Sequence, residues 1–151
     1  MPIRVNPSEE TIRIGPVTVR FLITGEQSGG TVAMFEAVIA AGTGVAAPPH
    51  SHDHYEETAY GIEGTTTLTI DGQRFDVGPG QAVCIPRGAV HRLENHGTHD
   101  SKALSVVTPA AIGPQFFREM AAVINVAGPP DRAKLVEIMR RHGLTPVPPP
   151  A

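Results

Sequence analysis

Residues 44–64 read GVAAPPHSHDHYEETAYGIEG and place His50 and His52 two positions apart, with Glu57 five positions further along. Side chains two positions apart on an extended strand point to the same face of the sheet. Both imidazoles therefore face one way, and Glu57 follows after one short turn. This segment offers two nitrogen ligands and one carboxylate oxygen to a metal ion.

A second segment, GQAVCIPRGAVHRLEN at residues 80–95, supplies one more histidine. Pro86 and Gly88 favour a turn that aims His91 from a separate strand. A histidine pair alone is a weak signal, but three imidazoles and one carboxylate suit a borderline divalent metal. We therefore predict a metal site formed by His50, His52, Glu57 and His91. The alternative is a barrel that keeps these residues and works without a metal.

Four further histidines are not expected to be ligands. His54 continues the alternation, but it lies in a predicted loop, so we expect it beside the metal ligands or in solvent. His96 and His99 belong to the polar turn NHGTHDS, and His142 lies near a helix end. Loops run over the surface, so we expect these three side chains to be surface residues.

Length and charge restrict the kind of partner. The chain has 151 residues, 40% of them hydrophobic, so it can bury a core without a metal or a disulfide. Its net charge is −3, its pI is near 6.1, and it has no run of Lys or Arg. Such a chain has no basic field for nucleic acid or for an anionic membrane surface, which leaves a small molecule as the expected partner.

The single cysteine, Cys84, excludes an internal disulfide. Free cysteine is commonly buried, and the surrounding AVCIP is apolar, so we expect Cys84 to be a core side chain. The polar start MPIRVNPSEE does not read as a secretory signal, and no apolar run approaches the length of a membrane span. We expect a cytoplasmic protein.

Short β-branched and apolar runs alternate with Gly, Pro, Asp and Asn over residues 16–109, which predicts an all-β sandwich or small barrel. Asp71-Gly72 is a strong signal for a two-residue hairpin. After Pro109 the pattern becomes helical, first in PQFFREMAAVINV and then in DRAKLVEIMRRH. We therefore divide the chain into a barrel with N-terminal strands, residues 1–109, and a helical extension of the same domain, residues 110–151.

The two predicted helices each carry one apolar face. We expect these faces to pack on the outside of the barrel or on a partner subunit, rather than to form a mobile lid. The last residues, TPVPPPA, are expected to form an extended or disordered tail.

Residues 44–95 resemble the two-part signature of the cupins at every fixed position, although Gln81 stands where many relatives have Asp. The resemblance implies a double-stranded β-helix, or jelly-roll barrel. It also implies one Fe, Mn, Ni, Co or Zn ion per chain, held by His50, His52, Glu57 and His91. The C-terminal extension is similar to that of quercetin-dioxygenase-like cupins. We expect a homodimer.

By this resemblance the leading activity is an oxygen-dependent dioxygenase acting on a small enol, phenol or flavonol-like substrate, with Glu57 as the catalytic base. The alternatives are a non-redox metal-dependent isomerase, lyase or decarboxylase, or a non-catalytic binding barrel. A metal-free epimerase would need a tyrosine acid, and the chain has only Tyr55 and Tyr60, of which Tyr60 alternates away from Glu57. A sugar-phosphate isomerase would need cations at the site, and only Arg87 and Arg92 adjoin the motifs.

Ala59 and Gly61 continue the face of Glu57, because they follow it at steps of two. Ala has a very small side chain and Gly has none, so we expect these two residues to leave space and to form the floor of a substrate pocket. Two alternatives are open. Phe21, Phe35 or Phe75 from neighbouring strands could fill the space. Gly61 could instead mark a bulge, which would break the count by twos.

Overall fold

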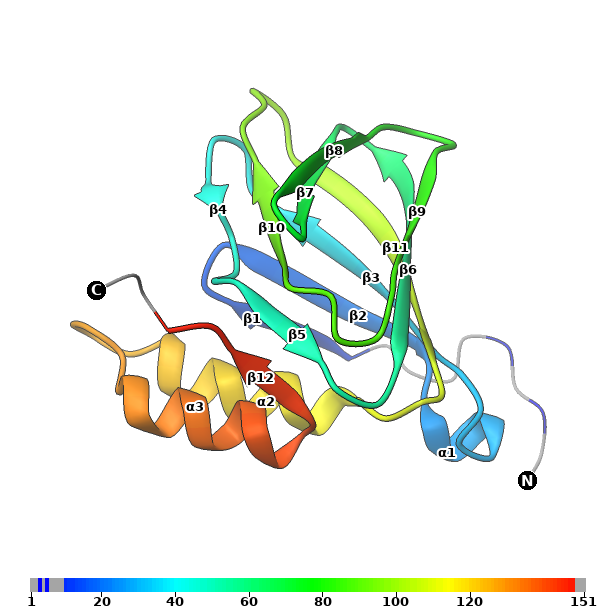
Figure 1. Ribbon diagram of the computed structural model, residues 1–151, viewed down its shortest axis with the longest axis vertical. Coiled ribbons are helices and arrows are strands. Elements are labelled where there is room, and N and C mark those ends of the chain that lie inside the picture. Colours follow the sequence, from blue (N-terminus) through cyan, green and yellow to red (C-terminus); the bar gives the residue numbers. More distant parts are fainter. Residues whose placement is uncertain (1–2, 4, 6–9, 149–151) are drawn as a thin grey trace.

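Two antiparallel β-sheets that face each other make up most of the computed structural model, which describes residues 3, 5 and 10–148 (Figure 1). The first sheet has the order β1 (Thr11–Ile14), β2 (Val17–Ile23), β3 (Ala33–Ile39), β11 (Ser101–Thr108), β6 (Glu56–Glu63) and β9 (Ala82–Ile85). The second has the order β12 (Leu144–Pro146), β5 (His50–His52), β10 (His91–Asn95), β7 (Thr66–Ile70) and β8 (Gln73–Val77), with β4 (Gly44–Val45) paired to β10. The helices are α1 (Gly25–Ser28), α2 (Pro114–Ile124) and α3 (Arg132–Arg141). The predicted all-β jelly-roll barrel with a helical extension is confirmed.

The hairpin between β7 and β8 turns at Asp71 and Gly72, as predicted. Their φ angles are 47° and 81°, and Ile70 lies opposite Gln73 across the ladder. A two-residue type I′ turn needs positive φ at both central positions, which Gly adopts freely and Asp tolerates. The local sequence therefore fixes this register.

Strand β6 alternates strictly between the barrel interior and the outer surface. Glu57, Ala59 and Gly61 are buried, whereas Tyr60 is 45% exposed. The predicted orientation of Tyr60 away from Glu57 is confirmed. The ladder to β11 shifts register beyond Gly61, so a bulge follows this glycine without disturbing the count from Glu57 to Ala59.

The prediction for Cys84 is wrong. Its side chain is exposed on β9, which is an edge strand of the first sheet. The neighbouring Ile85 is fully buried and lies opposite Glu57. Because side chains alternate along a strand, burial of Ile85 turns Cys84 to the outer face.

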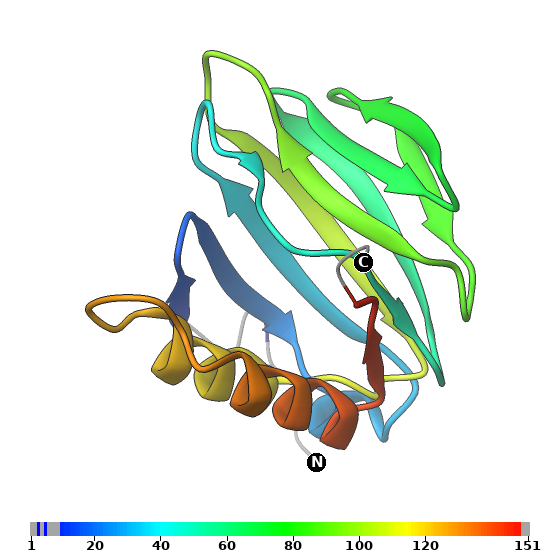
Figure 2. The ribbon, with the colours of Figure 1, turned by 60° about the vertical axis from the view of Figure 1, so that its left-hand side comes forward.

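The two longer helices lie beneath one end of the sheets, and β12 runs from the end of α3 to the edge of β5 (Figure 2). Their buried side chains join a core cluster with residues of β2 and β3. The buried members from the helical extension are Ile112, Phe116, Val123, Ile138, Met139 and Leu144. The expectation that the apolar helical faces pack against the barrel is therefore confirmed, and these faces share the barrel core at one end.

A second core cluster fills the barrel away from the helices, and it contains Ala59, Leu68, Ile70, Val77, Ile85 and Ala89. The predicted tail begins in an extended conformation, as one of its two expected forms, because Thr145 and Pro146 belong to β12. Residues 149–151 lie outside the described part. No helix in the described residues is long and apolar enough to cross a membrane.

Candidate metal centre

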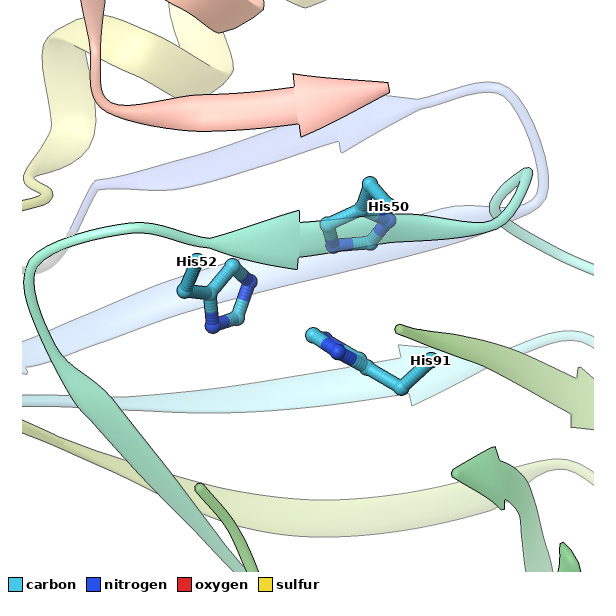
Figure 3. Close-up of side chains that lie close together, drawn as sticks. All are labelled: His50, His52 and His91. Atoms are coloured by element: carbon cyan, nitrogen blue, oxygen red, sulfur yellow. The ribbon is translucent and has the colours of Figure 1, made fainter. Parts of the chain in front are cut away.

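Three buried histidines meet inside the barrel. His50 and His52 point inward from β5, and His91 points inward from β10, where it lies directly opposite His50. Their exposed fractions are 9%, 3% and 2%, and one ring nitrogen from each lies within 4.8 Å of the other two. Figure 3 shows the three rings turned toward one another. The predicted convergence of these three side chains is therefore present in the structure.

Backbone carbonyls orient two of the three rings. Nδ1 of His50 lies 2.9 Å from the Pro48 carbonyl oxygen, and Nδ1 of His91 lies 3.0 Å from that of Ala89. A carbonyl oxygen only accepts, so each Nδ1 carries the proton and each Nε2 keeps a free lone pair. Metal-binding histidines are commonly fixed in this way by their second nitrogen. The donor chemistry therefore fits a first-row divalent ion.

The histidines are held in the uncharged form that a metal requires. Burial is the largest cause, and the neighbouring His91 adds to it, so the pKa of His50 falls to about 4. The pKa values of His52 and His91 are also lowered, mainly by burial. Only neutral imidazole binds a metal ion. At neutral pH, protons therefore compete only weakly with the ion for these ring nitrogens.

Glu57 faces the same space from the opposite sheet. It is 8% exposed and lines the cavity together with the three histidines, but it lies outside the group of mutually close ligand atoms. Removal from water disfavours the charged carboxylate and raises the pKa of Glu57 to about 7. The carboxylate is therefore placed at the site, but it is set back from the three nitrogens.

The cavity beside the histidines has a volume of about 180 Å³, and its lining is mostly apolar. Ala59 lines it, as predicted, and so does Phe35. Gly61 is not among the lining residues, which corrects the expectation for this position. A Cβ atom at Gly61 would lie 2.0 Å from the carbonyl oxygen of Gly78, so this glycine permits a close backbone approach between β6 and the loop after β8.

Sequence analysis missed Tyr55 as a residue of the site. Its ring stacks on His52 with centroids 4.4 Å apart, it is 1% exposed, and it lines the cavity. Its buried hydroxyl has no hydrogen-bond partner among the described residues. The signal was present, because counting back by two from Glu57 gives Tyr55.

The remaining histidines lie away from the centre. His54, His96 and His99 are exposed, as expected. His142 is partly buried between the helices, where its Nε2 lies 2.5 Å from Oε2 of Glu119, so it is not a simple surface residue. None of these four belongs to a possible metal-binding group within the described residues.

The two arginines beside the motifs are engaged elsewhere. Arg87 pairs with Glu56 at 2.8 Å, and Arg92 pairs with Glu94 at 3.3 Å. Over residues 10–148, no Lys or Arg side chain lines the cavity. A phosphorylated ligand would therefore find no cation there.

Comparisons with known proteins agree with this geometry. Residues 35–107 match the family described as Cupin domain. The quercetin 2,3-dioxygenase of Bacillus subtilis is 37% identical over 73 residues, which are 47% of this chain and 20% of that protein. The tetracenomycin polyketide synthase protein TcmJ of Streptomyces glaucescens is 26% identical over 98 residues, 65% of each chain.

Among solved structures, the polyketide cyclase RemF of Streptomyces resistomycificus superposes with a TM-score of 0.54 at 27% identity, covering 70% of both chains. The chain spans between 20% and 65% of the length of the curated relatives that it matches.

Proposed function

We propose that this chain, which belongs to the cupin superfamily, is a metal-dependent enzyme that acts on a small enol or phenol. The observation that carries the proposal is the group of three buried histidines beside an apolar cavity, two of which, His50 and His91, keep their Nε2 atoms free. Enzyme sites commonly combine an apolar pocket with a few converging polar groups.

His50, His52 and His91 would hold the ion, which we propose to be Fe, Mn, Ni, Co or Zn. A bound divalent ion supplies Lewis acidity, and a redox-active one also supplies chemistry with dioxygen. Glu57 would accept the proton of the substrate hydroxyl on its carboxylate oxygen, because it faces the same cavity and is itself removed from water. We retain Glu57 as a proposed fourth ligand, since one carboxylate can bind an ion and move a proton.

The leading reaction is oxygen-dependent cleavage of the substrate. Similarity to the Bacillus subtilis quercetin 2,3-dioxygenase supports this choice, although the likeness covers only part of either chain. The cavity wall also suits such chemistry, because apolar side chains exclude water from reactive species.

A second candidate is ring closure without a redox step. Three similar proteins are named for polyketide biosynthesis, and one of them is a polyketide cyclase. Isomerase, lyase or decarboxylase chemistry belongs to the same non-redox class, and a non-catalytic binding barrel is the remaining alternative. All of these candidates use a small molecule as partner.

Metal analysis and oxygen uptake test the proposal together. Protein purified without added metal is expected to contain one first-row ion per chain, and enol and phenol substrates should cause stoichiometric oxygen uptake. Product formation without oxygen uptake would favour the non-redox candidate. Metal-loaded protein that binds these compounds but converts none would favour the binding barrel.

We also propose that the protein is a homodimer. Exposed apolar side chains are available for an interface, among them Tyr60 at 45% exposure on the outer face of β6. Light scattering of the full chain should give twice the mass of 15.9 kDa. A mass of one chain at micromolar concentration would contradict the dimer.

A further inference from the structure

The cavity lining comes from the barrel and from the helical extension. The barrel contributes the polar groups, among them the three histidines and Glu57, together with many apolar side chains. Helix α2 forms a further wall of apolar side chains only, Phe116, Phe117, Met120 and Ile124. Helix α2 lies outside the residues that match the family, so this wall is a feature that the extension adds to the barrel.

The α2 wall is built on a packed group of aromatic rings. Phe117 lies with its ring centroid 5.2 Å from that of Phe35 and 5.7 Å from that of Phe21, and the last two centroids are 5.0 Å apart. Aromatic rings at these separations attract one another in tilted and edge-to-face arrangements. Phe117 is therefore fixed in place by β2 and β3, while it also lines the cavity.

The space that this wall leaves is small. The cavity volume is about 180 Å³. An apolar cavity of about 150 Å³ is enough to hold benzene, whereas pockets for drug-sized ligands span about 300–1,000 Å³. This volume thus matches one aromatic ring with a few substituents. A flavonol, with its three rings, exceeds it.

We infer that α2 acts as a size filter, in which Phe117 and Met120 restrict the site to single-ring phenols or enols and exclude flavonols and fused polyketide rings. The inference rests on the proposed function, because it assumes that the substrate oxygen is presented to the histidines. It makes Phe117 and Met120 specificity-determining residues, although neither touches the histidine group. It also predicts a substrate smaller than those named for the relatives.

Binding to the Zn(II)-loaded full chain tests the size filter without oxidation. The probes are catechol, which has one ring, and quercetin, which has three rings and also chelates through adjacent oxygens. We expect the wild type to bind catechol at least about tenfold more tightly than quercetin, since an oversized ligand has to displace packed side chains. Phe117→Ala or Met120→Ala should reduce this preference at least about tenfold, with unchanged zinc content.

Val123→Ala is the matched control, because Val123 is 7% exposed on the same helix but does not line the cavity. If Phe117→Ala fails to fold, Met120→Ala still tests the wall, because it removes a different side chain from the same helix. The inference is overturned if the wild type fails to bind catechol or binds quercetin equally well. It is also overturned if Val123→Ala relaxes the preference as much as the folded wall variants do.

Failure of the proposed function gives a different result. If the protein with its native metal binds catechol but converts no phenol or enol, the enzyme assignment fails and the size filter stands. If it oxidises quercetin as fast as catechol, the size filter fails and the enzyme assignment stands.

Discussion

Leu144 lies directly opposite His52 in the ladder between β12 and β5. The C-terminal strand therefore pairs with the strand that carries two of the three histidines. The amide of Asp53 donates to the Gly143 carbonyl at 2.9 Å, and the amide of Val147 donates to that of Pro49 at 3.0 Å. These bonds flank His50 and His52 on both sides, so β12 holds the ligand strand in position.

Ending the chain after Gly143 should therefore weaken both stability and metal binding. The truncation exposes the edge of β5 and removes Leu144, which is 3% exposed. Loss of this burial and of the ladder bonds should cost roughly 2–4 kcal/mol of unfolding free energy. Displaced ligands should lower metal affinity about tenfold or more, as changes next to metal ligands commonly do.

Denaturant titration and metal-competition assays measure the two effects of the truncation. A chain that ends after Pro148 is the matched control, because it keeps β12 and should behave as the wild type. Unchanged metal affinity in the chain that ends after Gly143 would show that β5 does not depend on β12.

Replacement of the histidines separates ligands from neighbours. His50→Ala, His52→Ala and His91→Ala should each remove most of the bound metal, whereas His54→Ala should retain it because His54 is exposed. Circular dichroism should show a folded barrel in every variant. Metal loss in His54→Ala together with retention in His50→Ala would contradict the assignment.

Glu57→Gln should retain more metal than any of the three histidine variants, because Glu57 lies outside the group of close ligand atoms. Its turnover should fall at least about a hundredfold if the carboxylate moves the substrate proton. Metal content and turnover are measured on the same preparation. Full turnover in the metal-loaded variant would remove Glu57 from the mechanism.

The histidine site was predictable from sequence because strand periodicity carries most of its geometry. The two-residue period of a β-strand places His50 and His52 on one face. The same period, counted from Glu57, places Ala59 on the interior face of β6. Pairing between distant strands is not encoded in any local pattern, so the partnership of β12 with β5 could not be predicted. For the same reason the sequence could not show that the backbone of Gly78 fills the space beside Gly61.

Gly61→Ala tests whether that space is filled. The added Cβ would lie 2.0 Å from the Gly78 carbonyl oxygen, and backbone cannot move aside as a flexible side chain can. We expect a loss of roughly 1–3 kcal/mol or more in unfolding free energy. A Gly61 position on an open pocket floor would accept the methyl group without loss.

Gly113→Ala is the matched control for Gly61→Ala, because an added Cβ at Gly113 meets nothing within 4 Å and its φ is −142°. Gly113 is the N-cap of α2, where Ala is less favourable than Gly, so the melting temperature of this variant should fall slightly, but by less than that of Gly61→Ala. Equal stability of the two variants would show that β6 and the Gly78 loop can separate without cost.

Tyr55→Phe tests the buried hydroxyl beside His52. This hydroxyl has no partner among the described residues, so its removal breaks no hydrogen bond and relieves an unpaired polar group. The unfolding free energy of the metal-free protein should stay constant or rise by about 1 kcal/mol. A loss of more than about 1 kcal/mol would indicate a partner that the hydroxyl finds in solution.

The pH dependence of stability should report the burial of Glu57. Its pKa is about 7 in the folded metal-free protein, against 4.5 as the ordinary value. Because the folded pKa is the higher one, the contribution of Glu57 to stability is fully present below pH 4.5 and is lost as pH rises toward 7. The buried histidines act in the opposite sense, since their lowered pKa values disfavour the folded state at acid pH, so the Glu57 contribution is obtained from the difference between two variants. The loss should approach about 3 kcal/mol at most.

Glu57→Gln removes this titration, so its unfolding free energy relative to the wild type should improve as pH rises from 4.5 to 8. Denaturant titrations of both metal-free proteins across this range measure the difference. Glu56→Gln is the control, because Glu56 is an exposed neighbour whose pKa is lowered by its hydrogen bonds with Arg87, and it should show no such gain. A bound divalent ion would stabilise the Glu57 carboxylate, so the pH-dependent difference between Glu57→Gln and the wild type should shrink when both proteins are loaded with metal. A constant difference between Glu57→Gln and the wild type at every pH would mean that this carboxylate is not removed from water.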